Sequence, residues 1–326
     1  MHLKITKRKI QTALGLLWLF DGLLQLQPQM FGSHFVSGVI LPAAQGQPLF
    51  VTGPMHALIH IFLLHPALFN SLAALTQLSL GALILSKPTL KIGLIASIAW
   101  GLFVWSVGEA YGGIFSGHSL VLMGAPGAAL LYVILALAAM PKDHDKKVSE
   151  PPYWLTFVWA ICWIGGAIYQ LLPSQNTVSS LSSMIAGNGS GQPGWLASLD
   201  YHLGSLINGF GKPLSSAVHM SAAQMATMPT EGNSGYWFIL LIATVMIFIG
   251  LAIFYPRFRT VAVVLGIIVS LVFWVVGQSF GGIFTGLATD PSSAPLFVLL
   301  GLAVLSCGTA RHNLHSFFKA VERTIT

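Results

Sequence analysis

Two acidic residues lie inside long apolar segments of this 326-residue chain. Asp21 falls in the middle of the segment 10–28, and Glu109 falls near the end of the segment 92–111. Burying an ionisable side chain in hydrocarbon is costly, so an acid in such a place is typical of proton transfer, ion binding or substrate anchoring. A structural role is also open, in which each carboxyl group hydrogen-bonds a neighbouring helix. No basic residue lies within the apolar segments to pair with either acid.

The surroundings of Glu109 occur twice in the chain. The sequence WSVGEAYGGIF at 105–115 returns as WVVGQSFGGIF at 274–284, so that Gln278 stands where the first copy has Glu109. The shared glycines allow helices to approach closely or to break near a surface. One polar position thus differs between two otherwise similar copies.

The duplication extends beyond this phrase. WLFDGLLQLQP at 18–28 aligns with WIGGAIYQLLP at 163–173, an offset of 145 residues. The offset of the later phrase is 169 and also pairs Pro126 with Pro295. The second half therefore carries an insertion of about 24 residues, the difference between the two offsets, between its first and second apolar segments.

Three glutamines extend the polar set inside the apolar segments. Gln25 lies one helical turn outward from Asp21, and Gln170 occupies the same place in the second half. Amide groups both donate and accept hydrogen bonds. We expect Asp21, Gln25, Glu109, Gln170 and Gln278 to line a path for a small solute or ion.

Histidines offer a second kind of chemistry. His56 and His60 are four residues apart and would share one face of a helix. With His65, His118 or Glu109 nearby, they could bind a transition metal or a haem. Histidines near a membrane surface also commonly hydrogen-bond the backbone or lipid headgroups, and this reading stays open.

The composition indicates a membrane protein. Only 7% of the residues are charged and 55% are hydrophobic, whereas roughly a quarter of a soluble domain is charged. A bilayer core is spanned by about 20 apolar residues in a helix, which pairs its backbone groups within the segment. We therefore expect an all-α integral membrane protein with eight transmembrane helices. They are expected at 10–28, 67–86, 92–111, 119–140, 154–173, 236–254, 260–280 and 293–310.

The basic residues predict the orientation of these helices. All but one of the 15 Lys and Arg residues fall on one side of the expected membrane, and the exception is Lys212. The positive-inside rule then places both termini in the cytoplasm, in a multi-pass protein of the plasma or inner membrane. The connections 29–66 and 174–235 fall on the exoplasmic side. The basic residues lie between apolar runs and form no patch, so a nucleic-acid partner is not expected.

Each half contributes four helices, and an even number means that both halves enter the membrane from the same side. We expect a first repeat at 1–140, a cytoplasmic linker at 141–152 and a second repeat at 153–326 with an exoplasmic insertion at about 194–235. The connections 29–66 and 174–235 also predict extra amphipathic helices, because leucines recur at helical spacing from 196 to 207. Such helices could contact lipid, act as a lid or dock a protein partner.

The segment LGLLWLFDGLLQL at 14–26, the four-helix unit and its long outer connection resemble the DoxX-like group of small membrane proteins, here as two fused units. That resemblance implies quinone-linked redox work, of which thiosulfate oxidation is one example. It transfers no functional residue to this chain. The doubled phrase also resembles bacterial polytopic membrane proteins of unassigned activity.

Three functions fit these features. The first is a transporter-like protein that handles a small solute or ion at an outward-facing site between the repeats. The second is a membrane oxidoreductase that binds quinone, a transition metal or haem near the outer leaflet. The third is an accessory membrane subunit that docks a membrane or exoplasmic protein partner.

Overall fold

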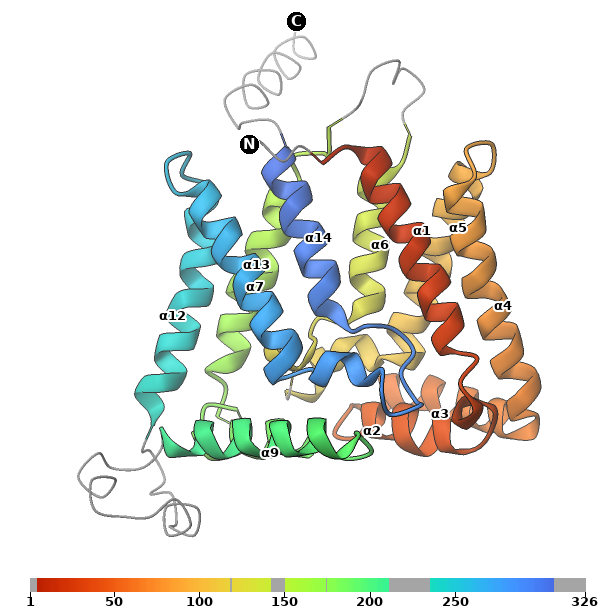
Figure 1. Cartoon of the computed structure of the whole chain (residues 1–326), viewed down its shortest axis with the longest axis horizontal. Helices are drawn as coiled ribbons and strands as arrows, with labels where there is room; N and C mark the ends of the chain where they lie inside the picture. The colour runs from red at the N-terminus through yellow and green to blue at the C-terminus, as the bar shows by residue number, and fades with distance from the viewer. Residues whose placement is uncertain (1–4, 118, 142–149, 174, 211–234, 308–326) are drawn as a thin grey trace, which may run out of the picture.

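The computed structural model describes residues 5–117, 119–141, 150–173, 175–210 and 235–307. Within these ranges the chain is helical and contains no β-strand, which confirms the predicted all-α class. The long helices run side by side as a bundle, and shorter helices cover one of its ends (Figure 1).

The bundle consists of two sets of four helices in chain order. The first set is α1 (Lys7–Leu24), α4 (Pro66–Leu85), α5 (Leu90–Phe103) with its π-helical extension η3 (Val104–Gly108), and α6 (Ala128–Ala139). The second set is α7 (Leu155–Gln170), α12 (Tyr236–Ala252), α13 (Arg259–Val276) and α14 (Ser293–Ser306).

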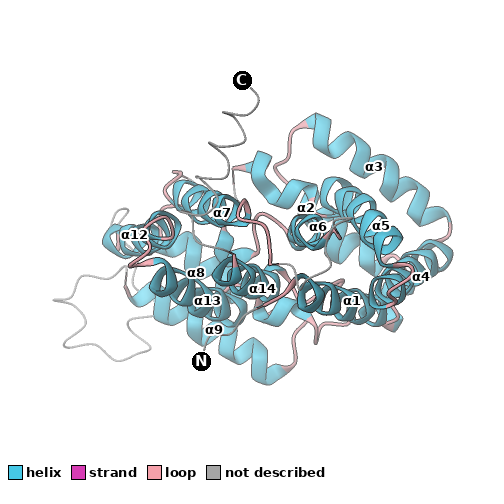
Figure 2. Cartoon of the chain, turned by 90° about the horizontal axis from the view of Figure 1, so that it is seen from above, coloured by secondary structure: helices cyan, strands magenta, loops and turns pink. Residues whose placement is uncertain are grey.

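The two sets pack in the same pattern. α1 contacts α4 and α6, and α5 contacts α4 and α6. In the second set, α7 contacts α12 and α14, and α13 contacts α12 and α14 (Figure 2). The sets meet where α6 packs against α14. The last helix of each set therefore lies at the junction.

Three helical segments are long and apolar enough to cross a membrane. They are Pro66–Leu85, Leu90–Gly108 and Arg259–Val276. α1 has 18 residues but carries Lys7, Arg8 and Lys9 in its first turn and Asp21 further along.

In four of the eight predicted spans the helical segment has 17 residues or fewer. α7 and α12 have 16 and 17 residues, and α14 and α6 have 14 and 12. In the predicted span 119–140, the helix begins only at Ala128, because Gly124, the proline at 126 and Gly127 interrupt the apolar run. Residues beyond Cys307 in the span 293–310 lie outside the described part of the chain.

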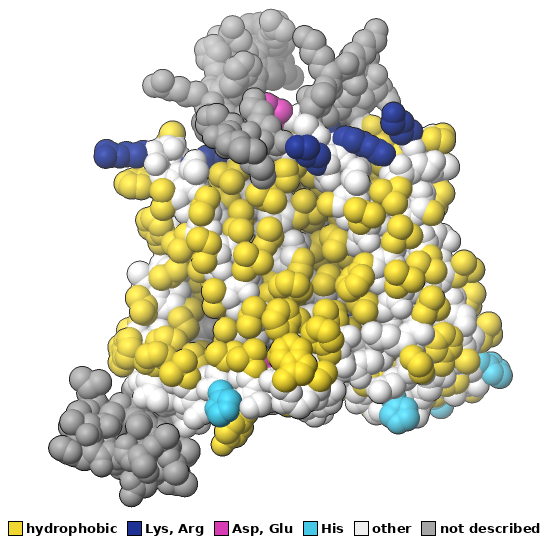
Figure 3. Space-filling model, viewed as in Figure 1, with side chains coloured by type: hydrophobic (Ala, Val, Ile, Leu, Met, Phe, Trp, Pro, Cys, Tyr) yellow, Lys and Arg dark blue, Asp and Glu magenta, His cyan; other side chains and the backbone are white. Residues whose placement is uncertain are grey.

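The sides of the bundle expose large apolar residues. Leu75, Ile92 and Ile161 have 62%, 63% and 69% of their surface exposed. Figure 3 shows apolar side chains over the whole height of the flank, with Lys and Arg at one end and His at the other. A continuous apolar flank of this size is typical of a surface that contacts lipid or protein, and it is compatible with a membrane protein.

Short helices cover the end opposite to the start of α1 and the end of α14. α2 (Leu41–Ala44), α3 (Leu49–Leu64) and α9 (Gly194–Gly209) lie across that end (Figure 1). α8 (Val178–Gly187) packs on α9. The leucine spacing from 196 to 207 correctly predicted a helix there. Single-turn elements complete the same end of the molecule: η1 (Pro28–Phe31), η2 (Val36–Ile40), η4 (Ala110–Ser116), η5 (Val121–Met123) and η6 (Ser279–Gly282).

Candidate functional site

The doubled phrase forms the same unusual turn in both sets of helices. Four consecutive residues have positive φ in each copy, with φ of 48–76° at 110–113 and 41–73° at Ser279–Gly282. The first two residues of each run are not glycine, and a left-handed backbone costs such residues about 1–2 kcal/mol each. Strained backbone that persists in a fold tends to cluster at functional sites.

Matching hydrogen bonds fix both turns. The indole N–H of Trp105 donates to the carbonyl of Pro126 over 2.8 Å, and that of Trp274 donates to the carbonyl of Pro291 over 2.8 Å. The structural counterpart of Pro126 is therefore Pro291. The predicted pairing with Pro295 is wrong, because the second loop is four residues shorter and a constant offset does not hold across it.

Glu109 and Gln278 occupy equivalent positions after these helices. A carboxylate oxygen of Glu109 accepts the backbone N–H of Ala129 over 3.1 Å, and the amide oxygen of Gln278 accepts that of Ala294 over 3.2 Å. These bonds satisfy N–H groups of buried residues in the first turns of α6 and α14, which no residue inside those helices can pair. The structural role foreseen for Glu109 is thus present, and its negative charge suits a helix N-terminus.

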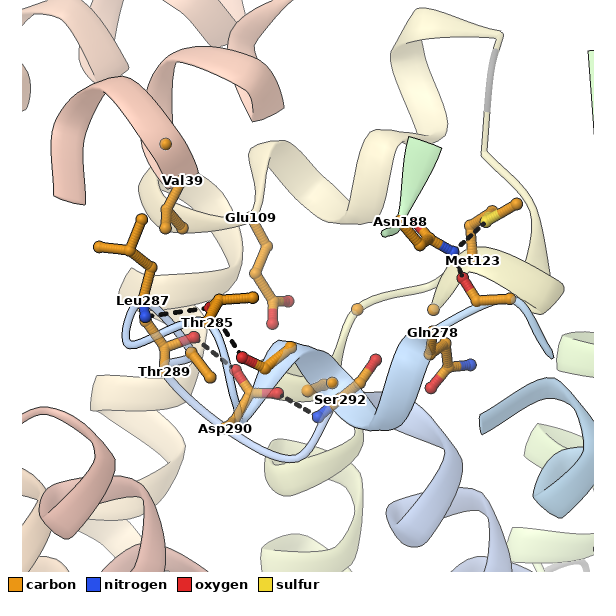
Figure 4. A pocket seen from close by; sticks show the side chains of 18 of the residues that line it. Val39, Glu109, Met123, Asn188, Gln278, Thr285, Leu287, Thr289, Asp290 and Ser292 are labelled. Carbon is orange, nitrogen blue, oxygen red and sulfur yellow. Dashed lines mark hydrogen bonds between the residues drawn. The ribbon is translucent and has the colours of Figure 1, made fainter. Parts of the chain in front are cut away.

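A polar cavity of about 780 Å³ lies where the two sets of helices meet. Glu109 and Asp290 stand on facing walls of this cavity (Figure 4). No Lys, Arg or His occurs among the described residues that line it. Its polar lining comprises Gln29, Glu109, Asn188, Ser190, Gln278, Thr285, Thr289, Asp290 and Ser292.

Asp290 is a site residue that the sequence analysis missed. It lies in the loop between η6 and α14, where its carboxylate accepts the hydroxyl of Thr289 over 2.7 Å and the backbone N–H of Ser292 over 2.8 Å. Burial raises the pKa of Asp290, and these two hydrogen bonds partly offset that rise. The sequence feature that could have identified Asp290 is that no other acidic residue occurs between Glu231 and Glu322.

Asp21 adjoins the same acids. It is 1% exposed, and its carboxyl group interacts with the buried hydroxyl of Tyr132. A small cavity of about 20 Å³ touches both residues together with Glu109 and Asp290. The fold therefore gathers three carboxyl groups, two from the first set of helices and one from the second, around one buried space.

Two of the predicted path residues serve other contacts. Gln25 and Asn70 exchange hydrogen bonds of 2.5 and 2.9 Å, which tie the end of α1 to α4. Gln170 donates to the carbonyl of Gln175 over 3.1 Å. Both glutamines are buried, but neither lines the polar cavity. Glu109 lies beside Gln278 in the polar cavity, beside Asp21 at the small cavity, and beside Gln25 at a third, mostly apolar cavity, whereas Gln170 lines none of the three.

The predicted metal or haem site has no support in the described residues. His56, His60 and His65 all have exposed side chains, and His118 lies outside the described residues. The described part of the chain contains no group of three His, Cys, Asp or Glu residues that could hold a metal ion. The HxxxH spacing does place two histidines on one helix, α3, but it brings no third ligand to them.

A further buried acid supports the second turn. Asp200 of α9 is fully buried and accepts the hydroxyl of Ser279 over 2.7 Å. The amide of Gln192 reaches the same hydroxyl over 3.2 Å. Burial raises the pKa of Asp200, and the bond from Ser279 partly offsets this. Asp200 therefore links the covering helix α9 to the residue that follows Gln278.

No known protein family, curated protein or solved structure matches this chain. The resemblance to DoxX-like units therefore stays a prediction, and the functional argument rests on the geometry of the cavity.

The glycines in and near the first left-handed turn, at 110–113, allow a direct test of the strain in that turn. A Cβ on Gly112 would collide with the carbonyl of Pro126, whereas one on Gly117 would meet nothing within 4 Å. Both residues have positive φ. We expect Gly117→Ala to lower the free energy of unfolding by about 1 kcal/mol and Gly112→Ala to lower it by about 1–3 kcal/mol more. Thermal unfolding in detergent measures both, and equal losses would contradict the packing of the turn.

Proposed function

We propose that the protein crosses the membrane eight times as two four-helix units of the same orientation, with both termini in the cytoplasm. Each of the long helices overlaps one of the eight predicted segments, and the two sets pack alike. The basic residues of the described chain gather at the end where α1 begins (Figure 3). This end would face the cytoplasm, and α3 and α9 would cover the outer end.

The short helices α6 and α14 support this arrangement. Irregular backbone is tolerated at membrane depth only where protein buries it or where it lines a polar cavity. The irregular residues before α6 and α14 line the polar cavity, among them Ala125, Gly127 and Ser292. Broken helices whose ends point at a central site are typical of transporters.

Cysteine labelling tests this topology. The starting protein has its two cysteines, Cys162 and Cys307, replaced by serine. We expect a membrane-impermeant maleimide to label His60→Cys in intact cells and Lys87→Cys only after the cells are opened, because the two exposed positions lie at opposite ends of the bundle. Labelling of Lys87→Cys alone from outside would contradict the orientation.

We propose that the polar cavity binds a small organic cation from the outer side and exchanges it for a proton. The observation that carries this proposal is the pair Glu109 and Asp290 on one cavity, with no basic residue among its described lining. Two nearby carboxylates oppose each other's ionisation, so the empty pair favours holding a proton. A bound cation would replace that proton and balance the negative charge of the two carboxylates.

A guanidinium or ammonium group suits this pair better than a metal ion. Planar guanidinium donates paired hydrogen bonds to carboxylates. A metal ion would require more ligands than the two carboxylates, and the described residues offer no group of three metal-binding side chains. Because burial raises the pKa of Asp290, that carboxyl retains its proton at a higher pH than an ordinary aspartate.

Asp21 would extend the path of a proton from the polar cavity into the helix bundle. The small cavity between Asp21, Tyr132 and the two site acids, of about 20 Å³, has room for one water molecule, since about 10–15 Å³ suffices. Such a water would lie beside the interacting pair Asp21 and Tyr132 and next to the two site acids. A proton released at the cavity could then reach a carboxyl group deeper in the bundle.

Uptake by proteoliposomes tests the exchange. With an acidic interior, we expect radiolabelled guanidinium to enter several-fold faster than into protein-free vesicles. Glu109→Gln and Asp290→Asn should each reduce this uptake by at least about tenfold, because a charged hydrogen bond contributes about 1.5–3 kcal/mol. Glu150→Gln, an acid exposed at the opposite end, is the matched control and should retain uptake.

Two results would contradict the exchange. One is uptake at the protein-free rate by a correctly folded protein. The other is equal uptake by the wild type and by both acid variants. Asp21→Asn separates the two roles of the acids, since it should slow uptake driven by the pH gradient but leave equilibrium binding of guanidinium in place.

A redox function is the second candidate, because Glu109 also lines a mostly apolar groove that has several aromatic residues in its walls. A benzoquinol could lie in that groove and donate a hydroxyl hydrogen bond to the carboxylate. Extraction of the purified protein for quinone, together with its visible spectrum, decides this point. Stoichiometric quinone would favour the redox reading over the carrier.

A further inference from the structure

A second, mostly apolar cavity joins the polar one at Glu109. It has a volume of about 360 Å³ and lies between α3, α4 and the segment α5–η3. This volume falls near the lower end of small-molecule pockets, roughly 300–1,000 Å³. We call it the lateral groove. Val39, Glu109 and Thr289 line both the lateral groove and the polar cavity, so the two spaces meet at these residues.

The lateral groove opens on the apolar flank of the bundle. Ile61, Leu72 and Phe103 line it and have 49%, 49% and 44% of their surface exposed. α4 and the segment Leu90–Gly108, which form two of its walls, are two of the three segments long enough to cross a membrane. In a bilayer, the mouth of the groove would therefore face lipid tails.

Part of the lining of the lateral groove is polar and incompletely paired. Gln77 is 6% exposed, and its amide oxygen has no hydrogen-bond partner among the described residues. Within the same residues, the buried indole N–H of Trp100 also has no partner. Together with the Glu109 carboxylate, these groups offer two acceptors and one donor to a molecule in the groove. Unpaired buried polar atoms of this kind call for a partner.

We propose that the lateral groove and the polar cavity together bind one cationic amphiphile, with its alkyl tail in the groove and its charged head at Glu109. This inference rests on the proposed function and names its substrate class. The substrate would enter sideways from the outer half of the bilayer, in addition to any route from water.

The charges of the site select the head group. Every charged side chain on the described lining of the two spaces is acidic, so an anionic head would be repelled. A neutral head carries no charge to balance an ionised Glu109, so it could not displace the proton that the empty pair of carboxyl groups favours holding. A cationic head meets both carboxylates, while the apolar walls remove the tail from water.

Competition binding in lipid nanodiscs tests this proposal. The probes are guanidinium and dodecylguanidinium, with dodecanol, dodecanoate and a decyl-substituted benzoquinol as comparison ligands. Protein-free nanodiscs correct for partition into lipid. We expect dodecylguanidinium to bind at least about tenfold more tightly than guanidinium and dodecanol and dodecanoate to compete poorly.

Filling the lateral groove should remove the advantage of the tail. Ala73 and Thr76 line the groove on α4, whereas Leu75 on the same helix is 62% exposed and does not line it. We expect Ala73→Phe and Thr76→Phe each to weaken dodecylguanidinium binding about tenfold and to leave guanidinium binding unchanged. Leu75→Phe is the matched control and should change neither.

The outcomes separate this proposal from the carrier function. If guanidinium binds but groove filling leaves the ratio of the two affinities unchanged, the lateral groove is not the tail site and the carrier proposal stands. If neither cation binds the wild type, both proposals fail. If the benzoquinol competes better than dodecylguanidinium, the cationic head is wrong. Binding of guanidinium by each groove variant shows that the variant has folded.

Discussion

The architecture depends on one hydrogen-bonding requirement, the capping of two short helices inside the bundle. α6 and α14 begin next to a cavity, and their first N–H groups cannot be paired within the helix. Glu109 and Gln278 accept N–H groups of Ala129 and Ala294, respectively. Each cap comes from the end of the preceding long helix, which must turn sharply to present it. The left-handed turns at 110–113 and Ser279–Gly282 follow from this need.

The two caps differ in charge, and this difference gives the site its chemistry. An amide at Gln278 satisfies the helix and adds no charge, whereas the carboxylate at Glu109 also faces Asp290 across the cavity (Figure 4). Near-equivalent turns thus contribute one charged cap and one neutral cap to the cavity. A symmetric scaffold with a single charged cap explains why both copies of the phrase keep the glycines and the tryptophan, whereas the capping residue is an acid in one copy and an amide in the other.

Sequence reasoning found the residues whose chemistry stands out against their neighbours. Asp21 and Glu109 were visible as acids in apolar runs, and the repeat located Gln278. Asp290 was missed because its burial depends on a loop that folds back between helices of both sets. The run 119–140 looked continuous, although Gly124, Pro126 and Gly127 signalled the late start of α6. The histidine spacing placed His56 and His60 on α3 but could not show that both side chains are exposed and that the described residues supply no third metal ligand.

The central claim is that a cation and a proton compete for the carboxylates of Glu109 and Asp290. Difference infrared spectroscopy of the protein in nanodiscs, recorded before and after addition of guanidinium, observes the protonated carboxyl group directly. The account predicts that guanidinium abolishes a carboxyl C=O band and that this change is missing from Glu109→Gln and Asp290→Asn but present in Glu150→Gln. Binding of guanidinium with no change in that band would contradict it.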